Sequence, residues 1–368
     1  MATLFPARAS YIWISGKDTH HDIRGKDKTL YLTEEELKQT PDALLAAGKF
    51  AVWNFDGSST NQAKGLDTEI LVTPVRVFIS SLPNAVPDIK WFVVLCECFL
   101  PSGEPTPDNT RYIARSVFDA DKKNLRPWFG MEQEYVLMRR GRPYGWPSFG
   151  FPGPQGPYYC GIGPSSVYGR TLVERHYELC LAMGIKVSGI NAEVMPGQWE
   201  FQVGPCEGIE MGDHLIVSRW LFLRMLELES GEGEFLDVDY TAKPVKGDWN
   251  GSGLHTNFST TETREPEGLD AILRYIENLS HTVSKDIVVY GHDNNTRLSG
   301  HHETSRYDQF SYGVGTRGTS IRIPNAVKAE RTGYMEDRRP AGDVDPYLVS
   351  ARLFASAVNL PETELIDK

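Results

Sequence analysis

Two acidic side chains on either side of one turn, within residues 189–202, constrain the fold of this chain more than any other feature. Pro196-Gly197 lies at the centre of this stretch. Pro followed by Gly is typical of a tight turn, because Pro fixes φ and Gly tolerates a positive φ. If the chain folds back there, Glu193 lies opposite Glu200 on one face of a hairpin. Like charges in that position destabilise a strand pair. We therefore expect either that both carboxylates point into solvent or that a cation lies between them.

Residues 128–138 carry two more carboxylates on a second predicted strand. Side chains of a strand alternate between its faces, so Glu132 and Glu134 share one face. An acid-bearing strand by itself is more often a solvated face than a binding site. Two such strands, both flanked by aromatic residues and glycine, favour a divalent metal site built from several carboxylates.

A Gly-rich segment, residues 249–253, leads into a third predicted strand at residues 254–259. On this strand His255, Asn257 and Ser259 share a face. A single His is more often a structural hydrogen-bonding group than a ligand, but a neutral imidazole here could join the carboxylates on Mg²⁺ or Mn²⁺. The glycines leave backbone amides open to a carboxylate or a phosphate.

Two further segments supply charged groups without a clear secondary structure. Residues 295–304 have little apolar content and no period, which predicts either a mobile loop carrying Glu303 near a glycine hinge or an ordinary surface loop. Arg317 and Arg322 lie on opposite faces of a regular strand. They converge only if the chain is broken between them at Gly318.

Taken together, these residues favour chemistry on phosphate. Acids hold divalent cations, and cations together with Arg neutralise phosphate, so the set suits phosphoryl transfer. Residues 313–318 match the pattern G-x-G-x-x-G, but a predicted strand rather than a helix follows them, which argues against dinucleotide binding. The residues alone therefore indicate a metal-dependent, ATP-using transferase or ligase.

Charge and cysteine usage limit the partners and the compartment. The net charge of −11 argues against nucleic acid and anionic membranes as partners, because both require a basic surface. The five Cys are scattered along the chain, so we expect free thiols, as in a reducing compartment. The sequence has no apolar run long enough to span a membrane and no hydrophobic signal sequence, so we expect a cytoplasmic protein.

Periodicity predicts the order of the elements. Residues 8–100 form short strands with a polar loop at residues 16–18, and the Pro-rich residues 101–108 predict a domain boundary. A long loop, dense in Gly, Pro and aromatic residues, is expected at residues 141–164. Helices are expected at residues 109–124, 172–184, 214–228 and 268–287, the last three amphipathic.

Five long segments resemble signature segments of glutamine synthetases of the eukaryotic type, namely residues 54–60, 128–135, 191–205, 250–259 and 334–340. They follow one another in the family's order, and the likeness extends over about residues 10–350. The resemblance implies an α+β fold. A small N-terminal β-grasp domain is expected at residues 8–101, and a large catalytic domain, a curved antiparallel sheet flanked by helices, at residues 107–368.

The resemblance also implies the reaction and the assembly. The expected enzyme is a glutamate–ammonia ligase that takes L-glutamate, ammonium and ATP and gives L-glutamine, ADP and phosphate. Its intermediate is γ-glutamyl phosphate, formed at a site with two or more Mg²⁺ or Mn²⁺ ions. Active sites shared between subunits imply a homo-oligomer, a decamer of two stacked pentameric rings.

The family's site residues carry over to this chain motif by motif. One implied metal-ligand set is Glu134, Glu193 and Glu200, and the other is Glu132, His255 and Glu336. Positions that resemble the glutamate site are Trp249, Asn250, Gly251, Arg297, Arg317 and Arg338. Positions that resemble the ATP site are Glu132, Glu200, Asn257, Phe258, Ser259, Arg317, Arg322, Tyr334 and Glu336.

The implied catalytic groups are Asp56, Glu303, Arg317 and Arg338. Asp56, with Ser59 and Tyr159, resembles the ammonium site and would come from a neighbouring subunit. Glu303 matches the glutamate of the family's flap, the loop at residues 295–304, which closes over the intermediate and helps to accept the ammonium proton. A closing loop is also expected on physical grounds, because an acyl phosphate must be shielded from water.

The chain departs from the family pattern at a few positions. Thr296 precedes Arg297 where animal relatives usually carry two consecutive Arg, and Met335 stands where Phe is usual. The segment 229–234 is more acidic than usual. No implied metal ligand is lost, which disfavours a catalytically inactive structural or sensing relative. The matching ammonium and flap positions disfavour a related ligase with another carboxylate or amine substrate.

Overall fold

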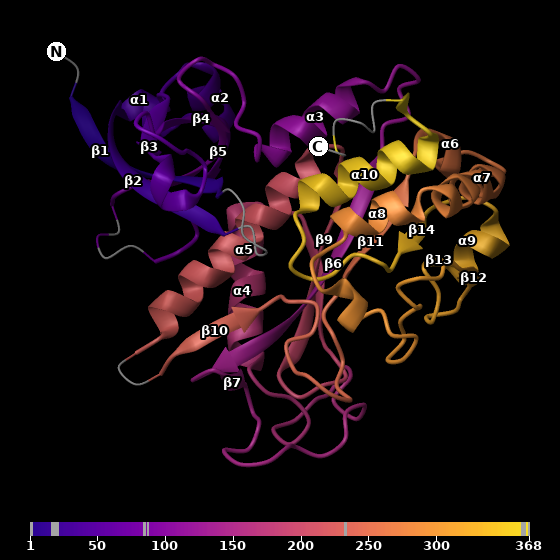
Figure 1. The fold of residues 1–368 in the computed structure, drawn as a ribbon. Coiled ribbons are helices and arrows are strands. Elements are labelled where there is room, and N and C mark those ends of the chain that lie inside the picture. Colours follow the sequence, from indigo (N-terminus) through magenta and orange to yellow (C-terminus); the bar gives the residue numbers. More distant parts are fainter. Residues whose placement is uncertain are drawn as a thin grey trace.

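The computed structural model describes residues 3–15, 22–83, 86, 88–231, 234–361 and 366. The polar loop predicted at residues 16–18 and part of the acidic segment 229–234 lie outside the described residues. The fold is α+β, as expected, with a five-stranded and a nine-stranded sheet. In Figure 1 the N-terminal strands, drawn in indigo and violet, gather on one side, apart from the orange and yellow C-terminal elements.

The N-terminal sheet has the strand order β2-β1-β5-β4-β3. Its strands are β1 (Leu4–Ile14), β2 (Ile23–Thr33), β3 (Trp53–Asp56), β4 (Glu69–Ile79) and β5 (Trp91–Phe99), with α1 (Glu34–Leu37), α2 (Pro41–Ala46) and the 3₁₀ turn η1 (Gly57–Thr60) between them. β5 is an almost continuous apolar run, as expected of a strand covered on both faces. Phe92 and Val94 pack into the sheet's own core, whereas Trp91 and Val93 pack into the core of the C-terminal part. The two parts therefore share one strand as a joint.

The large sheet has the order β12-β13-β14-β11-β6-β9-β8. The chain-order bounds are β6 (Trp128–Arg139), β7 (Arg142–Pro143), β8 (Val187–Ala192), β9 (Gln198–Glu207), β10 (Leu236–Asp239), β11 (Leu254–Ser259), β12 (Tyr312–Val314), β13 (Ile321–Ile323) and β14 (Met335–Asp337). β6 lies between β11 and β9. On β6 the buried Met131 and Tyr135 face the core, and Glu132 and Glu134 lie on the other face, as their alternation predicts.

Helices cover the core side of this sheet (Figure 1). They are α3 (Thr110–Asp119), α4 (Arg170–Met183), α5 (Glu210–Glu229), α6 (Thr261–Arg264), α7 (Gly268–His281), α8 (Val283–Val289), α9 (Asn325–Glu330) and α10 (Pro346–Val358), with the 3₁₀ turn η2 at Asn294–Thr296. In the part of the chain that the structure describes, no helix has the length and hydropathy needed to cross a membrane.

Two helix predictions need correction. The helix predicted at residues 214–228 is α5, and it is not amphipathic, because residues 211–222 are all buried. The large sheet, α4 and α10 pack against it, and Phe78 and Trp91 of the N-terminal sheet contact His214 and Trp220. The helix predicted at residues 268–287 is interrupted at Thr282, where the backbone leaves helical geometry, and resumes as α8 up to Val289.

The central turn is confirmed, but its strand register is wrong. Gln198 N donates to Met195 O at 3.0 Å, which closes a turn over Pro196-Gly197. The ladder between β8 and β9 nevertheless pairs Asn191, not Glu193, with Glu200. The reason is tertiary: the carbonyl of Val194 accepts from Gly156 N of the long loop at 2.7 Å instead of pairing with β9. A slip of two residues keeps each side chain on its face, so Glu193 still lies beside Glu200.

Candidate active site

A cleft of about 540 Å³ opens over the face of the large sheet that carries the acids. It brings together most of the predicted site residues. These are Glu132, Glu134, Tyr159, Glu193, Glu200, Asn250, Gly251, His255, Arg297, Glu303, Arg317, Arg322, Glu336 and Arg338. The sequence prediction missed Gln155, Gly156, Asn191, Val194, Gln202, His302 and Thr304 in the lining.

Three buried carboxylates, Glu134, Glu193 and Glu200, form the first cluster in the cleft. One oxygen from each lies within 4.8 Å of the others. Glu134 and Glu200 are direct partners across β6 and β9, and Glu193 follows the end of β8. Gly253 N donates to Glu134 Oε2 at 2.5 Å. Among the described residues no Lys or Arg forms an ion pair with any of the three, so their negative charge is left uncompensated by the protein.

This uncompensated charge changes the acidity of the cluster. Burial, reinforced by Glu134, raises the pKa of Glu193 to about 8. Burial and the neighbouring glutamates, Glu132 first among them, raise the pKa of Glu200 well above its usual value. Without a cation the cluster therefore holds protons near neutral pH, and a bound cation would displace them.

Two amides orient the cluster, and the sequence analysis did not identify them. Gln202 Nε2 donates to Glu200 Oε1 at 2.5 Å and to Asn191 Oδ1 at 3.1 Å. Asn191 Nδ2 donates to Glu193 Oε1 at 3.0 Å. The signal was available, because Asn191 precedes Glu193 by two residues and Gln202 follows Glu200 by two, which places each amide on the acid face.

The second cluster is Glu132, His255 and Glu336, again with one ligand atom each within 4.8 Å. His255 Nδ1 lies 3.6 Å from Glu132 Oε2 and 3.7 Å from Glu336 Oε1. Burial, with the nearby Arg338, lowers the pKa of His255 to about 3, so the imidazole is neutral. Unlike the first cluster, this one is partly compensated: Arg322 Nη1 donates to Glu336 Oε2 at 2.8 Å and Arg338 Nη1 to Glu336 Oε1 at 2.5 Å.

The chemistry of both donor sets fits hard divalent cations. Carboxylate oxygens are the ligands that Mg²⁺ and Mn²⁺ prefer, and a neutral imidazole is compatible with Mn²⁺. The first cluster has three buried acids that form no ion pair with any described Lys or Arg, which is the charge pattern that a divalent cation relieves. The residues present therefore fit the metals that the resemblance implies.

The structure also shows whether Arg317 and Arg322 converge, which the sequence left open. Arg322 lies on the short β13, and Arg317 lies on the loop before it, so the two side chains reach the same cleft. Arg338 Nε donates to Arg317 O at 3.0 Å, which ties the loop to β14. Nε of Arg322 is buried and forms no hydrogen bond with any described residue. Three guanidinium groups thus flank the second acid cluster, where they could neutralise phosphate.

Glu303 lies at the mouth of the cleft, on the flap. Its carboxylate Oε2 lies 3.6 Å from Arg317 Nη1, and its carbonyl accepts from Arg338 Nη2 at 3.3 Å. The mobility predicted for the flap stays a prediction. Arg297, at the base of the flap, is 4 % exposed, and its Nη2 donates to Arg338 O at 3.0 Å and lies 3.1 Å from His255 Nε2.

The Gly-rich segment forms the floor beside the first cluster. Asn250 N donates to Gln155 Oε1 at 2.8 Å, and Asn250 Nδ2 to Gln198 Oε1 at 3.1 Å. A side chain at position 251 would meet Ala242 O at 2.5 Å, so only Gly fits there. Trp249 stacks on Phe151 of the long loop and contacts Trp146 at a tilt of 52°.

Seven predicted site residues do not line the cleft: Asp56, Ser59, Trp249, Asn257, Phe258, Ser259 and Tyr334. Asn257 lies beside it, on the same face of β11 as His255, and donates to Glu132 Oε1 at 2.8 Å. The side chain of Phe258 lies in the core against Phe129, because its alternation on β11 turns it away from the acids. Asp56 and Ser59 lie at the end of β3 in the N-terminal sheet.

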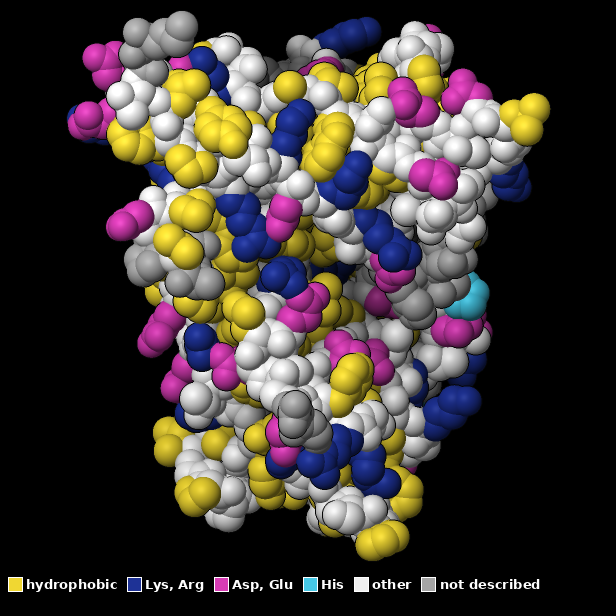
Figure 2. Space-filling view, turned by 90° about the vertical axis from the view of Figure 1, so that its left-hand side faces the viewer, with side chains coloured by type: hydrophobic (Ala, Val, Ile, Leu, Met, Phe, Trp, Pro, Cys, Tyr) yellow, Lys and Arg dark blue, Asp and Glu magenta, His cyan; other side chains and the backbone are white. Residues whose placement is uncertain are grey.

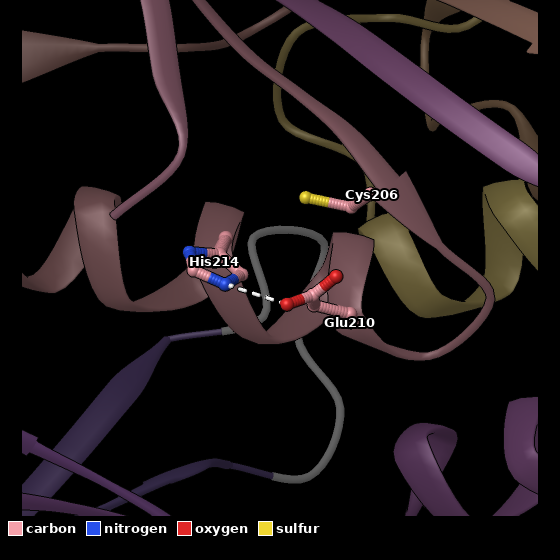
Figure 3. A group of neighbouring side chains, drawn as sticks. All are labelled: Cys206, Glu210 and His214. Carbon is pink, nitrogen blue, oxygen red and sulfur yellow. Dashed lines mark hydrogen bonds and ion pairs between the residues drawn. The ribbon is translucent and has the colours of Figure 1, made fainter. Parts of the chain in front are cut away.

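A third cluster of ligand-type side chains, Cys206, Glu210 and His214, lies outside the cleft. Figure 3 shows Glu210 and His214 one turn apart on α5, with Cys206 above them. Two basic side chains of the protein form ion pairs with this cluster. Arg76 Nη2 lies 3.1 Å and Lys186 Nζ 2.7 Å from the Glu210 carboxylate. Burial alone would raise the pKa of Glu210, but its bonds to Lys186 and Arg76 lower it to about 2.

The charge balance of this third cluster does not suit a metal. Burial raises the pKa of Cys206 to about 12, and Arg76 and Lys186 already neutralise the Glu210 carboxylate. His214 Nδ1 already accepts from Lys186 N at 3.1 Å. We therefore interpret this cluster, named the junction cluster below, as an ion-pair joint between the two sheets, since Arg76 comes from β4 and Glu210 from α5.

Comparisons with known proteins identify the family of the chain. Residues 108–359 match the family model for the glutamine synthetase catalytic domain. A glutamine synthetase of Tuber borchii is 49 % identical over 343 residues, covering 93 % of this chain and 89 % of that protein. A glutamine synthetase of Suillus bovinus is 46 % identical, covering 98 % of this chain and 94 % of that protein. A glutamine synthetase of Emericella nidulans is 48 % identical, covering 93 % of this chain and 90 % of that protein. The chain therefore belongs to the glutamine synthetase family, the ATP-dependent glutamate–ammonia ligases.

Proposed function

We propose that the cleft makes L-glutamine from L-glutamate, ammonium and ATP through γ-glutamyl phosphate at a two-metal site. The observation that carries this proposal is that two different clusters lie in one cleft. The first consists of three carboxylates without an ion-pair partner among the described residues. The second consists of two carboxylates and an imidazole, and arginines flank it. Such a site can hold cations at one end and a polyphosphate at the other.

In this account Glu134, Glu193 and Glu200 hold one Mg²⁺ or Mn²⁺ ion and Glu132, His255 and Glu336 the other. The ions, when bound, neutralise the phosphate oxygens and polarise the transferring group. Arg322 and Arg338 already lie against Glu336, so they are positioned to bind the ATP phosphates and the transferring phosphoryl group. Asn257, Phe258, Ser259 and Tyr334 would contribute to the nucleotide site at its outer edge.

Glutamate would lie between the first cluster and the flap. Asn250 and Gly251 would bind its amino end, with Trp249 as support, and Arg297 and Arg317 its carboxylates. Its γ-carboxylate would then face the phosphate bound by the arginines. Phosphoryl transfer makes the carboxyl carbon electrophilic, and attack by ammonia releases phosphate and forms the amide.

The ammonium site needs a second copy of the chain. Asp56 and Ser59, the implied ammonium residues, do not line the cleft of their own chain, whereas Tyr159 does. We place Asp56 and Ser59 at the cleft of a neighbouring copy, opposite Tyr159, with Glu303 accepting the proton that ammonium must lose before it attacks. A shared site implies a homo-oligomer, and we adopt the stacked-ring decamer.

Exposed apolar side chains support assembly. Phe149 is 92 % and Ile162 88 % exposed in the single chain. Figure 2 shows apolar side chains exposed at both the top and the lower end of the molecule, and such surfaces mark interfaces more often than free faces. We further propose the two domains at residues 8–101 and 107–368 and a cytoplasmic location.

The experiment is an omission assay. Phosphate and glutamine are measured with Mg²⁺, ATP, glutamate and ammonium, leaving out each in turn, for the wild type and for Glu303→Ala. We expect glutamine only in the complete mixture and a strongly impaired variant. An assembled protein that binds ATP but forms no glutamine in the complete mixture would contradict the proposal.

A further inference from the structure

A chain of three hydrogen bonds ties the flap to the two other segments that line the cleft. Asn250 N donates to Gln155 Oε1 at 2.8 Å. Gln155 Nε2 lies 2.9 Å from His302 Nδ1, and His302 Nε2 lies 2.9 Å from Asp248 Oδ1. His302 directly precedes Glu303, so the chain ends at the residue that the proposed function places over the intermediate.

One assignment of protons satisfies every group in this chain. Because Asn250 N can only donate, the Gln155 oxygen faces it and the Gln155 NH₂ group faces the ring. His302 Nδ1 must then accept, so Nε2 carries the ring proton and donates it to the Asp248 carboxylate. All donors point the same way along the chain, which fixes both the amide and the tautomer.

The backbone at this position is one that side chains rarely adopt. His302 has φ of 54° and Glu303 has φ of 59°, two consecutive left-handed residues, neither of them glycine. Such residues persist only when the surroundings hold them. The side chain of His302 is about four-fifths buried, whereas the Asp248 side chain that it contacts is 97 % exposed. The contact with Gln155 is therefore the one that can hold His302 in place.

The anchor on the Gln155 side is firm. The next residue, Gly156, donates from its backbone N to Val194 O at 2.7 Å, and Cys160 N donates to Ala192 O at 2.9 Å. The long loop is thereby fastened beside the first carboxylate cluster. His302 also forms a wall between the cleft and a second cavity of about 800 Å³, which Asp248 lines as well. Without its side chain, the two spaces would be joined at this point, directly beside Glu303.

We propose that Gln155, His302 and Asp248 form a latch, with His302 as the positioning residue that holds Glu303 over the cleft and keeps water out. This inference rests on the proposed function. When the latch is broken, water replaces ammonia in the attack on γ-glutamyl phosphate. Water then adds to the carboxyl carbon, the bond from that carbon to the phosphate oxygen breaks, phosphate and glutamate are released, and one proton goes to solvent. ATP is hydrolysed without forming glutamine.

The test is the ratio of phosphate to glutamine in the same reaction mixture, measured for His302→Ala, Gln155→Ala and the matched control His301→Ala. His301 is the adjacent residue of the same type, and its side chain is exposed. We expect a ratio of one for the wild type and the control, and a severalfold higher, glutamate-dependent ratio for both latch variants. The double variant should rise no further, since both changes break one link. His302→Asn, which keeps an acceptor near Nδ1 and tolerates positive φ, should restore the ratio towards one.

A latch that is only structural would lower both products together and leave the ratio at one, which would overturn the inference. If His302→Ala fails to assemble, Gln155→Ala tests the same link from the anchored loop. A wild type that forms no glutamine would overturn the proposed function, and the inference with it, whereas coupled variants of an active wild type would overturn the inference alone.

Discussion

The cleft and the junction cluster contain similar side chains and differ in how their charge is balanced. In the cleft, Glu134, Glu193 and Glu200 lie within ligand distance of one another, and no Lys or Arg in the described part of the chain forms an ion pair with them. In the junction cluster, Glu210 lies equally close to His214 and Cys206, but Arg76 and Lys186 already bind its carboxylate. Proximity of ligand atoms therefore does not identify a metal site, whereas uncompensated buried charge does.

The acidities express the same contrast. Burial and like charges raise the pKa of Glu193 to about 8. At the junction the bonds to Lys186 and Arg76 outweigh burial and lower the pKa of Glu210 to about 2. The first environment favours a proton or a metal ion, and the second favours a permanent ion pair. We infer that the cleft is built for binding and the junction for holding the two sheets together.

Breaking the junction should have the largest effect on stability. Asp213, on α5 beside this cluster, accepts from Arg111 Nε at 2.8 Å and from Tyr347 Oη at 2.7 Å, and it is 1 % exposed. Asp213→Asn removes one of the two carboxylates that bind the buried Arg111, which keeps only Glu97 Oε1, 2.7 Å from its Nη1. We expect this loss to cost about 1–3 kcal/mol. Urea denaturation measures this. An equally stable variant would show that the junction is not a structural joint.

Breaking the cleft should instead abolish activity while the fold survives. Glu200→Gln removes one of the proposed metal ligands and a buried acid. We expect glutamine formation to fall by more than about 100-fold, since even partners of ligands are typically worth 10–100-fold. The matched change at the junction, His214→Asn, should alter activity much less. Steady-state assays of glutamine formation at saturating Mg²⁺ compare the two variants. Similar losses of activity in both would contradict the claim that the cleft binds and the junction cluster is structural.

The pH dependence of stability should have opposite signs in the two regions. Glu193 keeps a proton in the metal-free fold that the unfolded chain loses, so stability should fall as pH rises from about 4.5 to about 8. Glu210 stays ionised in the fold, so its contribution is lost as pH falls from about 4.5 to about 2. Glu193→Gln should flatten the metal-free decline between pH 6 and 8 by at least about 1 kcal/mol.

Melting temperatures in EDTA across this range provide the check on that prediction. Adding Mg²⁺ should stabilise the wild type more at pH 8 than at pH 6, because the metal binds the deprotonated acids. A decline that persists unchanged in Glu193→Gln would show that another group causes it.

The sequence predicts the local parts of this structure well. Alternation on residues 128–138 correctly places Glu132 and Glu134 on one face, and the Pro196-Gly197 turn forms as expected. The family resemblance predicts the α+β fold. Hydrophobic periodicity and turn residues do not predict contacts between segments that are distant in the sequence. One such contact is the hydrogen bond from Gly156 to Val194 that shifts the β8–β9 register. Another is the packing of neighbouring elements that buries α5 on all sides.

The same limit applies to the site. The sequence leaves open whether Arg317 and Arg322 converge, because the answer depends on a loop entering a short strand. It also cannot distinguish the junction cluster from the cleft, because Arg76 reaches Glu210 from 134 residues away along the chain. Charge compensation is a property of the assembled fold.

The most direct test of this account is a count of Mn²⁺ ions bound per chain, from the electron paramagnetic resonance signal of free Mn²⁺ during titration of EDTA-treated protein. We predict at least two sites in the wild type, loss of one in Glu200→Gln, and no loss in His214→Asn. A full set of sites in Glu200→Gln, or a missing site in His214→Asn, would contradict the claim that uncompensated charge makes the cleft, and not the junction, the metal site.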